Sequence, residues 1–172
     1  MPAIRPRPLP DGTLLDRYRR NGAYTDCYTA DIAATVTQAR FVEAFYTTRV
    51  FKLERLILRL AVARPSTDAQ AAQLARGETD AFAAWEAEDR RENELLLCDL
   101  HGRTRSWLMV RPLDDGSGGT RLHFGSAVVP VHDPRSGETR MGAVYRALLG
   151  FHKLYSRILL RAARARIESS AA

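Results

Sequence analysis

His152 is the residue of this sequence whose type and surroundings are best suited to chemistry. At about 100° of rotation per helical residue, it shares one face with Tyr145 and Tyr155, and Leu148 lies there as well. A partly desolvated imidazole on an apolar face can bind the polar end of a ligand or transfer a proton. The alternative is a core histidine with satisfied ring nitrogens, because buried polar groups are usually hydrogen-bonded.

Predicted strands supply the other candidate ligand contacts, which are Trp85, Leu108 and Phe124. Side chains alternate between the two faces of a sheet, so Leu108 points inward if Trp107 points outward. His123 has the same outward parity as Trp107. We therefore expect Trp85 to be the more buried tryptophan. Trp107 is expected at a rim or in an interface, where a dimer is one option.

Charged side chains suggest two further kinds of site. Arg105 or Arg121 near a pocket mouth would pair with a carboxylate or a phosphate, although solvated strand arginines are the more common case. A run of acidic residues suggests a hard cation, and its members are Glu86, Glu88, Asp89, Glu92 and Glu94. The run matches no calcium-loop spacing and two arginines interrupt it. A solvated hairpin is therefore favoured, and no metal site is predicted.

The familiar signatures of catalysis and cofactor binding are absent from the sequence. It contains no nucleophile elbow, no phosphate-binding P-loop and no dinucleotide-binding fingerprint. The glycine-rich segment 116–119 lies between two predicted strands and opens no helix, so it is interpreted as a turn. Cys27 and Cys98 fit no metal spacing and are expected to be buried thiols. No cofactor is predicted, and whether the protein is an enzyme stays open.

The elements that must position these residues follow from hydrophobic periodicity. A composition rich in β-forming residues predicts a strand over 24–32, and alternation predicts strands over 82–88, 94–100, 103–111 and 120–129. Spacings of three and four predict helices over 37–62, with a bend near Thr47–Thr48, over Asp68–Arg76, with Gly77 as its C-cap, and over 141–167. Short connections make the four later strands sequential and antiparallel. Strands grouped apart from helices indicate an α+β fold.

The composition suits one globular domain, because the chain has 172 residues and 45% of them are apolar. The formal charge is +6, and all but two of the 26 basic residues are arginine. Residues 140–172 carry +6, whereas residues 21–139 carry −3. On the last helix, the wheel places Phe151 with His152 on the apolar face and Lys153, Arg157 and Arg161 on the opposite face. The basic charge is therefore interpreted as a solvated helix face, and nucleic acid is not expected as a partner.

Three segments are predicted along the chain: a proline-rich arm over 1–22, a single domain over 23–168 and a short tail over 169–172. Proline fixes φ and removes a hydrogen-bond donor, so the first part of the arm is expected to be extended and poorly ordered. No stretch reaches the ~18 uncharged apolar residues that a membrane span needs, and the start of the chain has no apolar signal segment. A cytoplasmic location is the resulting expectation.

Four motifs carry a resemblance to a known family: LERLILRL at 53–60, RSWLMVRPL at 105–113, GGTRLHF at 118–124 and LGFHKLYSRILLRA at 149–162. With them, the chain resembles the helix-grip superfamily of START, Bet v 1 and polyketide-cyclase proteins (SRPBCC), and an uncharacterised bacterial family within it. The resemblance spans about residues 24–166. It implies a curved antiparallel sheet wrapped around a long C-terminal helix, with two short helices after the first strand.

The resemblance also implies a function, because the space between sheet and long helix often holds a lipid, hormone or polyketide in that superfamily. We therefore expect an apolar small-molecule ligand in contact with His152 and the tyrosines of its face. One alternative is a cyclase or dehydratase with His152 as acid or base. Another is a protein that binds an anionic surface through the basic face of the last helix. The sequence does not determine the ligand or the oligomeric state.

Overall fold

A computed structural model describes residues 4–53, 55, 66–132, 139–140 and 143–170, and only the backbone of 131–132, 139–140 and 143–149. Its helices are α1 (Asp16–Arg20), α2 (Gln38–Tyr46), α4 (Asp68–Arg76) and α5 (Ala143–Ser169). The strands of its main sheet are β1 (Arg5–Pro6), β2 (Tyr24–Ile32), β3 (Ala81–Phe82), β4 (Trp85–Arg91), β5 (Glu94–Asp99), β6 (Thr104–Pro112) and β7 (Thr120–Val128). A separate hairpin joins β8 (Val131–His132) and β9 (Thr139–Arg140).

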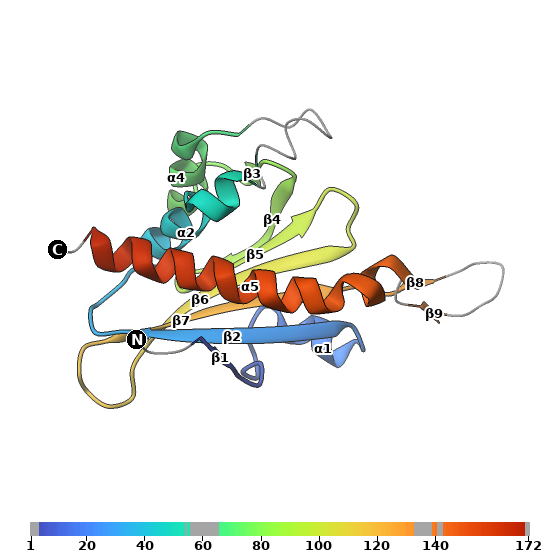
Figure 1. The fold of residues 1–172 in the computed structure, drawn as a ribbon, viewed down its shortest axis with the longest axis horizontal. Helices are drawn as coiled ribbons and strands as arrows, with labels where there is room; N and C mark the ends of the chain where they lie inside the picture. Colours follow the sequence, from blue (N-terminus) through green and yellow to red (C-terminus); the bar gives the residue numbers. More distant parts are fainter. Residues whose placement is uncertain (1–3, 54, 56–65, 133–138, 141–142, 171–172) are drawn as a thin grey trace.

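Strands β1 to β7 form one curved antiparallel sheet in the order β1-β2-β7-β6-β5-β4-β3. The first long strand, β2, therefore lies beside the last one, β7, although about a hundred residues separate Asp26 from its partner Ser126. Helix α5 crosses one face of the sheet over these strands, and α2, with α4 packed against it, lies on the same side near one end of the sheet (Figure 1). The prediction of an α+β fold with an antiparallel sheet and a C-terminal helix is confirmed.

The sequence located most elements to within two residues, and β2, α4 and the Gly77 cap were predicted without error. The strand expected over 82–88 is divided into β3 and β4, because Ala83 has a positive φ of 54°. The expected helix over 37–62 ends first at Tyr46 and becomes helical again at 49–53. Residues 56–62 of that prediction lie outside the described residues.

The bend after α2 is confirmed, and two threonines produce it. The hydroxyl of Thr47 donates to the Glu43 carbonyl oxygen at 2.7 Å, and that of Thr48 donates to the Phe45 carbonyl oxygen at 3.0 Å. Both side chains are buried. Hydroxyls bonded back to helical carbonyls weaken a helix and bend it, so α2 stops here.

The main core lies between the sheet and the helices and is rich in aromatic rings. Phe45 of α2 lies 4.7 Å from Phe124 of β7, and Tyr46 lies 5.3 Å from Phe82 of β3, centroid to centroid. These contacts fix α2 on the sheet, since paired aromatic rings bury large apolar areas.

A second core covers the opposite face of the sheet, and the N-terminal arm forms its outer layer. Leu9, Leu14 and Leu15 of the arm are buried with Trp107, which is 0% exposed. The expectation of a poorly ordered first part of the arm is therefore wrong for residues 4–12, where β1 pairs with β2 and Leu9 is buried. The expectation that Trp107 lies at a rim is also wrong, and Trp85, half-buried, is the less buried tryptophan.

The carboxylate of Glu94 fastens the arm to the sheet. One of its oxygens accepts hydrogen bonds from Trp107 Nε1 and from the Leu14 backbone N–H, each at 2.8 Å. The other oxygen lies 3.1 Å from Arg91 Nη1. Glu94 is only 4% exposed, so the expected solvated acidic hairpin is wrong at this residue.

Gly125 shows how closely the arm approaches the sheet. An added Cβ would lie 2.7 Å from the Asp26 carbonyl oxygen and 2.9 Å from both Leu15 and Trp107. Any larger residue would therefore push the arm and the tryptophan away from β7.

The face that helix α5 buries overlaps the expected one at Leu159, His152 and Tyr155 but is rotated away from Phe151. Its buried residues are Ser156, Leu159, Leu160, Ala163 and Ile167. Phe151, which the helical wheel placed on the buried face, is 64% exposed. In the part of the chain that the structure describes, no helix has the length and apolar character needed to cross a membrane.

We predict that Glu94→Ala lowers the free energy of unfolding by about 2–4 kcal/mol, because two buried N–H groups lose their acceptor. Urea denaturation measures this effect. The exposed Glu92, in the turn before Glu94, provides the matched control Glu92→Ala, which should change stability little. Equal stabilities of the two variants would contradict the anchoring role.

Candidate functional site

A row of polar side chains crosses the inner face of the sheet beneath α5 and α2. Asp26 of β2, Ser126 of β7 and Ser106 of β6 are direct cross-strand neighbours. Residues of the same parity, such as Tyr28 and Leu108, belong to the main core, so the row faces the core. The antiparallel register thus places three polar side chains from distant segments next to one another on an otherwise apolar face.

His152 of α5 contacts this row from the helix side. Its Nε2 lies 2.7 Å from the Ser126 hydroxyl oxygen and 3.4 Å from Asp26 Oδ2. The Ser126 hydroxyl donates to Asp26 Oδ1 at 2.6 Å, and the Ser126 backbone N–H donates to the same oxygen at 3.1 Å. Tyr24 adds a hydroxyl donor 3.3 Å from Asp26 Oδ2. We call Asp26, Ser126 and His152 the inner polar cluster.

The inner polar cluster has the residue types of a serine-hydrolase triad but a different hydrogen-bond order. A serine hydroxyl has one proton, and here Asp26 accepts it. His152 Nε2 must therefore donate to Ser126 rather than accept from it. In a triad, the histidine accepts the serine proton through one ring nitrogen and meets the carboxylate through the other. This arrangement holds the imidazole in place and leaves Ser126 without a histidine that accepts its proton.

A cleft of about 210 Å³ opens beside the inner polar cluster. Its walls come from α2 and the segment after it, from β4, β6 and β7, and from α5. The lining residues are Phe45, Phe51, Trp85, Thr104, Arg105, Ser106, Phe124, Ser126, Ala127, Val128, His152 and Leu159. Aromatic and aliphatic side chains form most of this wall, and His152 and Ser126 form a polar part of it.

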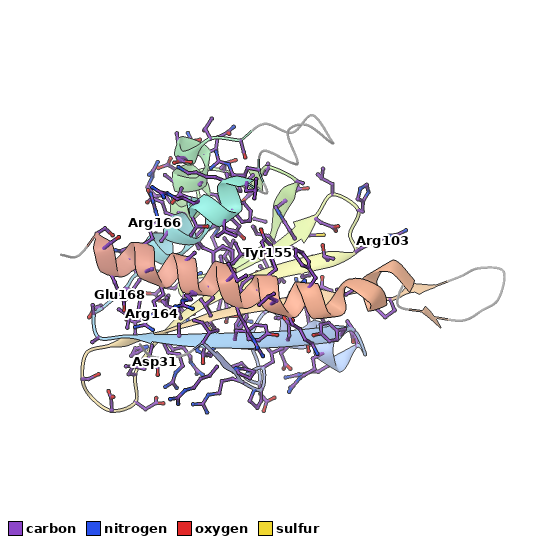
Figure 2. The ribbon with its side chains drawn as sticks, viewed as in Figure 1. Asp31, Arg103, Tyr155, Arg164, Arg166 and Glu168 are labelled. Carbon is purple, nitrogen blue, oxygen red and sulfur yellow. The ribbon has the colours of Figure 1, made fainter. Side chains whose placement is uncertain are left out.

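Three of the predicted ligand contacts line the cleft, namely His152, Trp85 and Phe124. Leu108 is fully buried in the main core and is not among the lining residues. Tyr155, labelled in Figure 2, packs against the same core, is half-buried and stacks on Phe151 with ring centroids 5.8 Å apart. The side chains of Tyr145 and Leu148 lie outside the described residues.

Sequence reasoning missed Asp26 and Ser126, the two strand residues that hold His152. A signal for Asp26 was present, because it has the inward parity of Tyr28, Ala30 and Ile32 in an apolar strand. An acidic residue on the buried face of a strand requires hydrogen-bond donors, which marks it as a site candidate. Ser126 had no comparable signal, since serine is common on both faces of a sheet.

The two arginines considered as anion sites pair with carboxylates of this chain. Arg105 donates from Nε to Glu88 at 2.6 Å and to the Tyr18 hydroxyl at 2.8 Å. Burial of Glu88 opposes its ionisation, but the hydrogen bonds from Tyr18 and Arg105 outweigh it and lower the pKa of Glu88. Arg121 makes two hydrogen bonds to Asp31 at 2.7 and 3.0 Å, which hold the pKa of Asp31 below its usual value.

On the outer face of the sheet, Cys27 and His123 lie side by side beneath the arm, with Sγ and Nδ1 4.0 Å apart. Burial raises the pKa of the Cys27 thiol to about 12. Burial, with Arg111 and Arg121 nearby, lowers the pKa of His123 to about 4. Both groups are therefore neutral at pH 7 and form part of the packing. Cys98 is only half-buried, unlike the expectation.

No group of three or more metal-ligating side chains occurs among the described residues. Comparisons with protein-family models, with curated proteins and with solved structures found no match for the chain. The cluster and its cleft must therefore be interpreted from their own chemistry.

We predict that a fluorophosphonate probe, which labels activated serines, does not modify Ser126. The Ser126 hydroxyl donates its hydrogen bond to Asp26, so His152 does not accept the serine proton. Intact-protein mass spectrometry after incubation with the probe measures this. A mass increase in the wild type that is lost in Ser126→Ala would show that the serine is activated and would contradict the donor order above.

The buried His123 should make stability depend on pH. The folded protein keeps it neutral down to about pH 4, whereas the unfolded chain protonates near 6.5. Stability is therefore complete above pH 6.5 and falls as the pH drops toward about 4, by up to about 3 kcal/mol from this group. Urea denaturation across this range should show a weaker pH dependence for His123→Leu than for the wild type. An identical pH dependence would contradict the buried neutral state.

Proposed function

We propose that this protein binds a small, mostly apolar molecule in the cleft between the sheet and α5, with a polar group of the ligand at the inner polar cluster. The observation that carries the proposal is the cleft itself, which has an apolar wall and a hydrogen-bonding end. Binding pockets commonly combine these two features, because apolar contact supplies affinity and a few polar groups fix orientation.

The size of the cleft limits the ligand. A volume of about 210 Å³ is smaller than the ~300–1,000 Å³ typical of drug-sized ligand pockets. Phe45, Phe51 and Phe124 supply flat apolar walls, which favour a ring system over a long flexible chain. We therefore propose a ligand of about one or two fused rings.

The polar end favours a ligand that donates a hydrogen bond. The Ser126 oxygen lines the cleft and keeps acceptor capacity while its hydrogen is donated to the Asp26 carboxylate, 2.6 Å away. The cationic Arg105 in the wall is engaged by Glu88 and Tyr18. An alcohol or a phenol therefore suits this end better than a carboxylate, which would meet Asp26 with like charge.

The fold supports the same proposal by analogy. We propose that the chain is a helix-grip protein, because β2 pairs with β7 and α5 packs across both strands of the curved sheet, as the resemblance to the SRPBCC superfamily implies. An apolar ligand between sheet and long helix is common in that superfamily. This support rests on analogy of fold, which by itself does not determine function.

A second candidate function is a cyclase or dehydratase reaction with His152 as the acid. The convergence of Ser126 and His152 on one cleft favours it, because such chemistry needs at least two polar groups at the reacting atoms. His152 Nε2 already donates to Ser126, and Tyr155 is not among the cleft-lining residues. Ligand binding needs neither a base nor a tyrosine and is therefore our first proposal.

Binding of 2-naphthol, a two-ring phenol, tests the proposal by isothermal titration calorimetry. We expect saturable binding to the wild type and at least about tenfold weaker binding to Thr104→Phe, which places a ring in the cleft. The matched control is Thr25→Phe, which adds the same ring at a half-buried threonine on the opposite face of the sheet.

The anion 2-naphthoate tests the polar end and should bind more weakly than 2-naphthol. Absence of binding of either compound to the wild type would overturn the proposal for this ligand class. Equal binding to Thr104→Phe and Thr25→Phe would place the ligand outside the cleft.

A further inference from the structure

The solvent-facing side of α5 carries a line of exposed apolar side chains. Phe151, Leu154 and Ile158 are 64%, 56% and 41% exposed. Their spacing of three and four residues places them along one line of the helix. We call these three residues the apolar strip. Contiguous apolar side chains on a surface usually mark a contact with a partner, because water disfavours them.

A row of positive charges runs beside the apolar strip. Lys153, Arg157 and Arg161 are exposed and follow one another at intervals of four residues. At about 100° per residue, this basic row lies roughly 90° around the helix from the strip. No acidic residue occurs in α5 before Glu168, which pairs with Arg164 near the C-terminal end of the helix (Figure 2).

The position of the basic row differs from the one predicted by the helical wheel. The sequence placed the basic residues directly opposite the buried face, but in the fold the apolar strip occupies most of that direction. Ser156 and Ala163, which are buried on the sheet side of α5, lie roughly 100° or more from the middle of the basic row and farther still from the apolar strip. α5 thus has one apolar face for the core and a second one, with a basic border, for another partner.

We propose that α5 docks this protein on the surface of a membrane that contains anionic phospholipids. The helix lies along the surface with Phe151, Leu154 and Ile158 at the boundary between headgroups and acyl chains. Lys153 and Arg157 lie against the headgroup phosphates. An apolar strip with a basic border is the pattern of helices that bind at membrane interfaces. Each Lys or Arg near an anionic surface adds to the attraction.

The chemistry of the strip distinguishes a membrane from other partners. A nucleic acid would use the basic row, but its phosphate backbone would leave the apolar strip in water. A second copy packed strip to strip would bury the apolar residues, but it would bring only positive charges to the border. An anionic lipid surface satisfies the strip and the basic row together.

Docking through the strip leaves the proposed ligand cleft free. The cleft is lined by His152 and Leu159, which lie on the sheet-facing side of α5. Membrane docking therefore does not depend on the proposed ligand binding. Failure of one proposal does not imply failure of the other.

Vesicle flotation with the full chain tests the proposal. The probes are phosphatidylcholine vesicles with and without phosphatidylserine, at low and at high salt. We expect flotation with the anionic vesicles, at least about tenfold stronger than with the neutral ones, and a loss at high salt. Leu154→Ser/Ile158→Ser and Lys153→Gln/Arg157→Gln should each weaken the partition coefficient by about tenfold or more.

Controls separate docking from folding and from overall charge. Arg7→Gln/Arg111→Gln removes the same charge from exposed arginines outside α5 and should float like the wild type. Because Arg157 also lies 5.3 Å over the buried Tyr28 ring, Lys153→Glu serves as a second charge variant. Melting temperatures verify that each variant is folded.

Four outcomes would overturn the proposal. The first is that the wild type floats with neither kind of vesicle. The second is that the α5 variants float as strongly as the wild type. A dimer that dissociates in Leu154→Ser/Ile158→Ser would assign the strip to a second copy. Salt-sensitive binding of duplex DNA through the basic row, unchanged by that variant and without flotation, would assign the row to nucleic acid.

Discussion

The pairing of β2 with β7 is the interaction on which the rest of this structure depends. It joins Tyr24–Ile32 to Thr120–Val128 through nine consecutive residue pairs. Because side chains alternate along each strand, one pairing builds two different environments. On the inner face it places Asp26 against Ser126 below His152. On the outer face it places Cys27 close to His123 below the arm.

Burial has a different effect on the polar groups of the two faces. On the outer face, burial keeps Cys27 and His123 neutral, and the Glu94 carboxylate fastens the arm that excludes water from them. On the inner face, a carboxylate, a hydroxyl and an imidazole satisfy one another beside a cleft. Buried polar groups are costly without partners, so a complete hydrogen-bond order stabilises the site and also fixes the direction in which His152 donates.

Helix α5 connects the inner site with the solvent. Its sheet-facing side contributes His152 and Leu159 to the cleft, and its outer side presents the apolar strip with the basic row beside it. A single helix can do both because its residues rotate by about 100° each, so positions three and four apart repeat on a face. The proposed ligand site and the proposed membrane surface are thus two sides of one element.

The sequence by itself determined most of the longer elements, because their composition, periods and caps are local. A composition rich in β-forming residues located β2, and the Thr47–Thr48 pair and Gly77 marked where helices bend or end. The tertiary structure decided which face of each element is covered. Strand parity separates Trp107 from Leu108, but only the arm, held by Glu94, makes the outer face a second core. Likewise, the helical period groups the residues of α5, yet the direction in which it packs was decided by contacts with distant strands. Asp26 and Ser126 became partners of His152 for the same reason, since register between distant segments is not encoded in either segment alone.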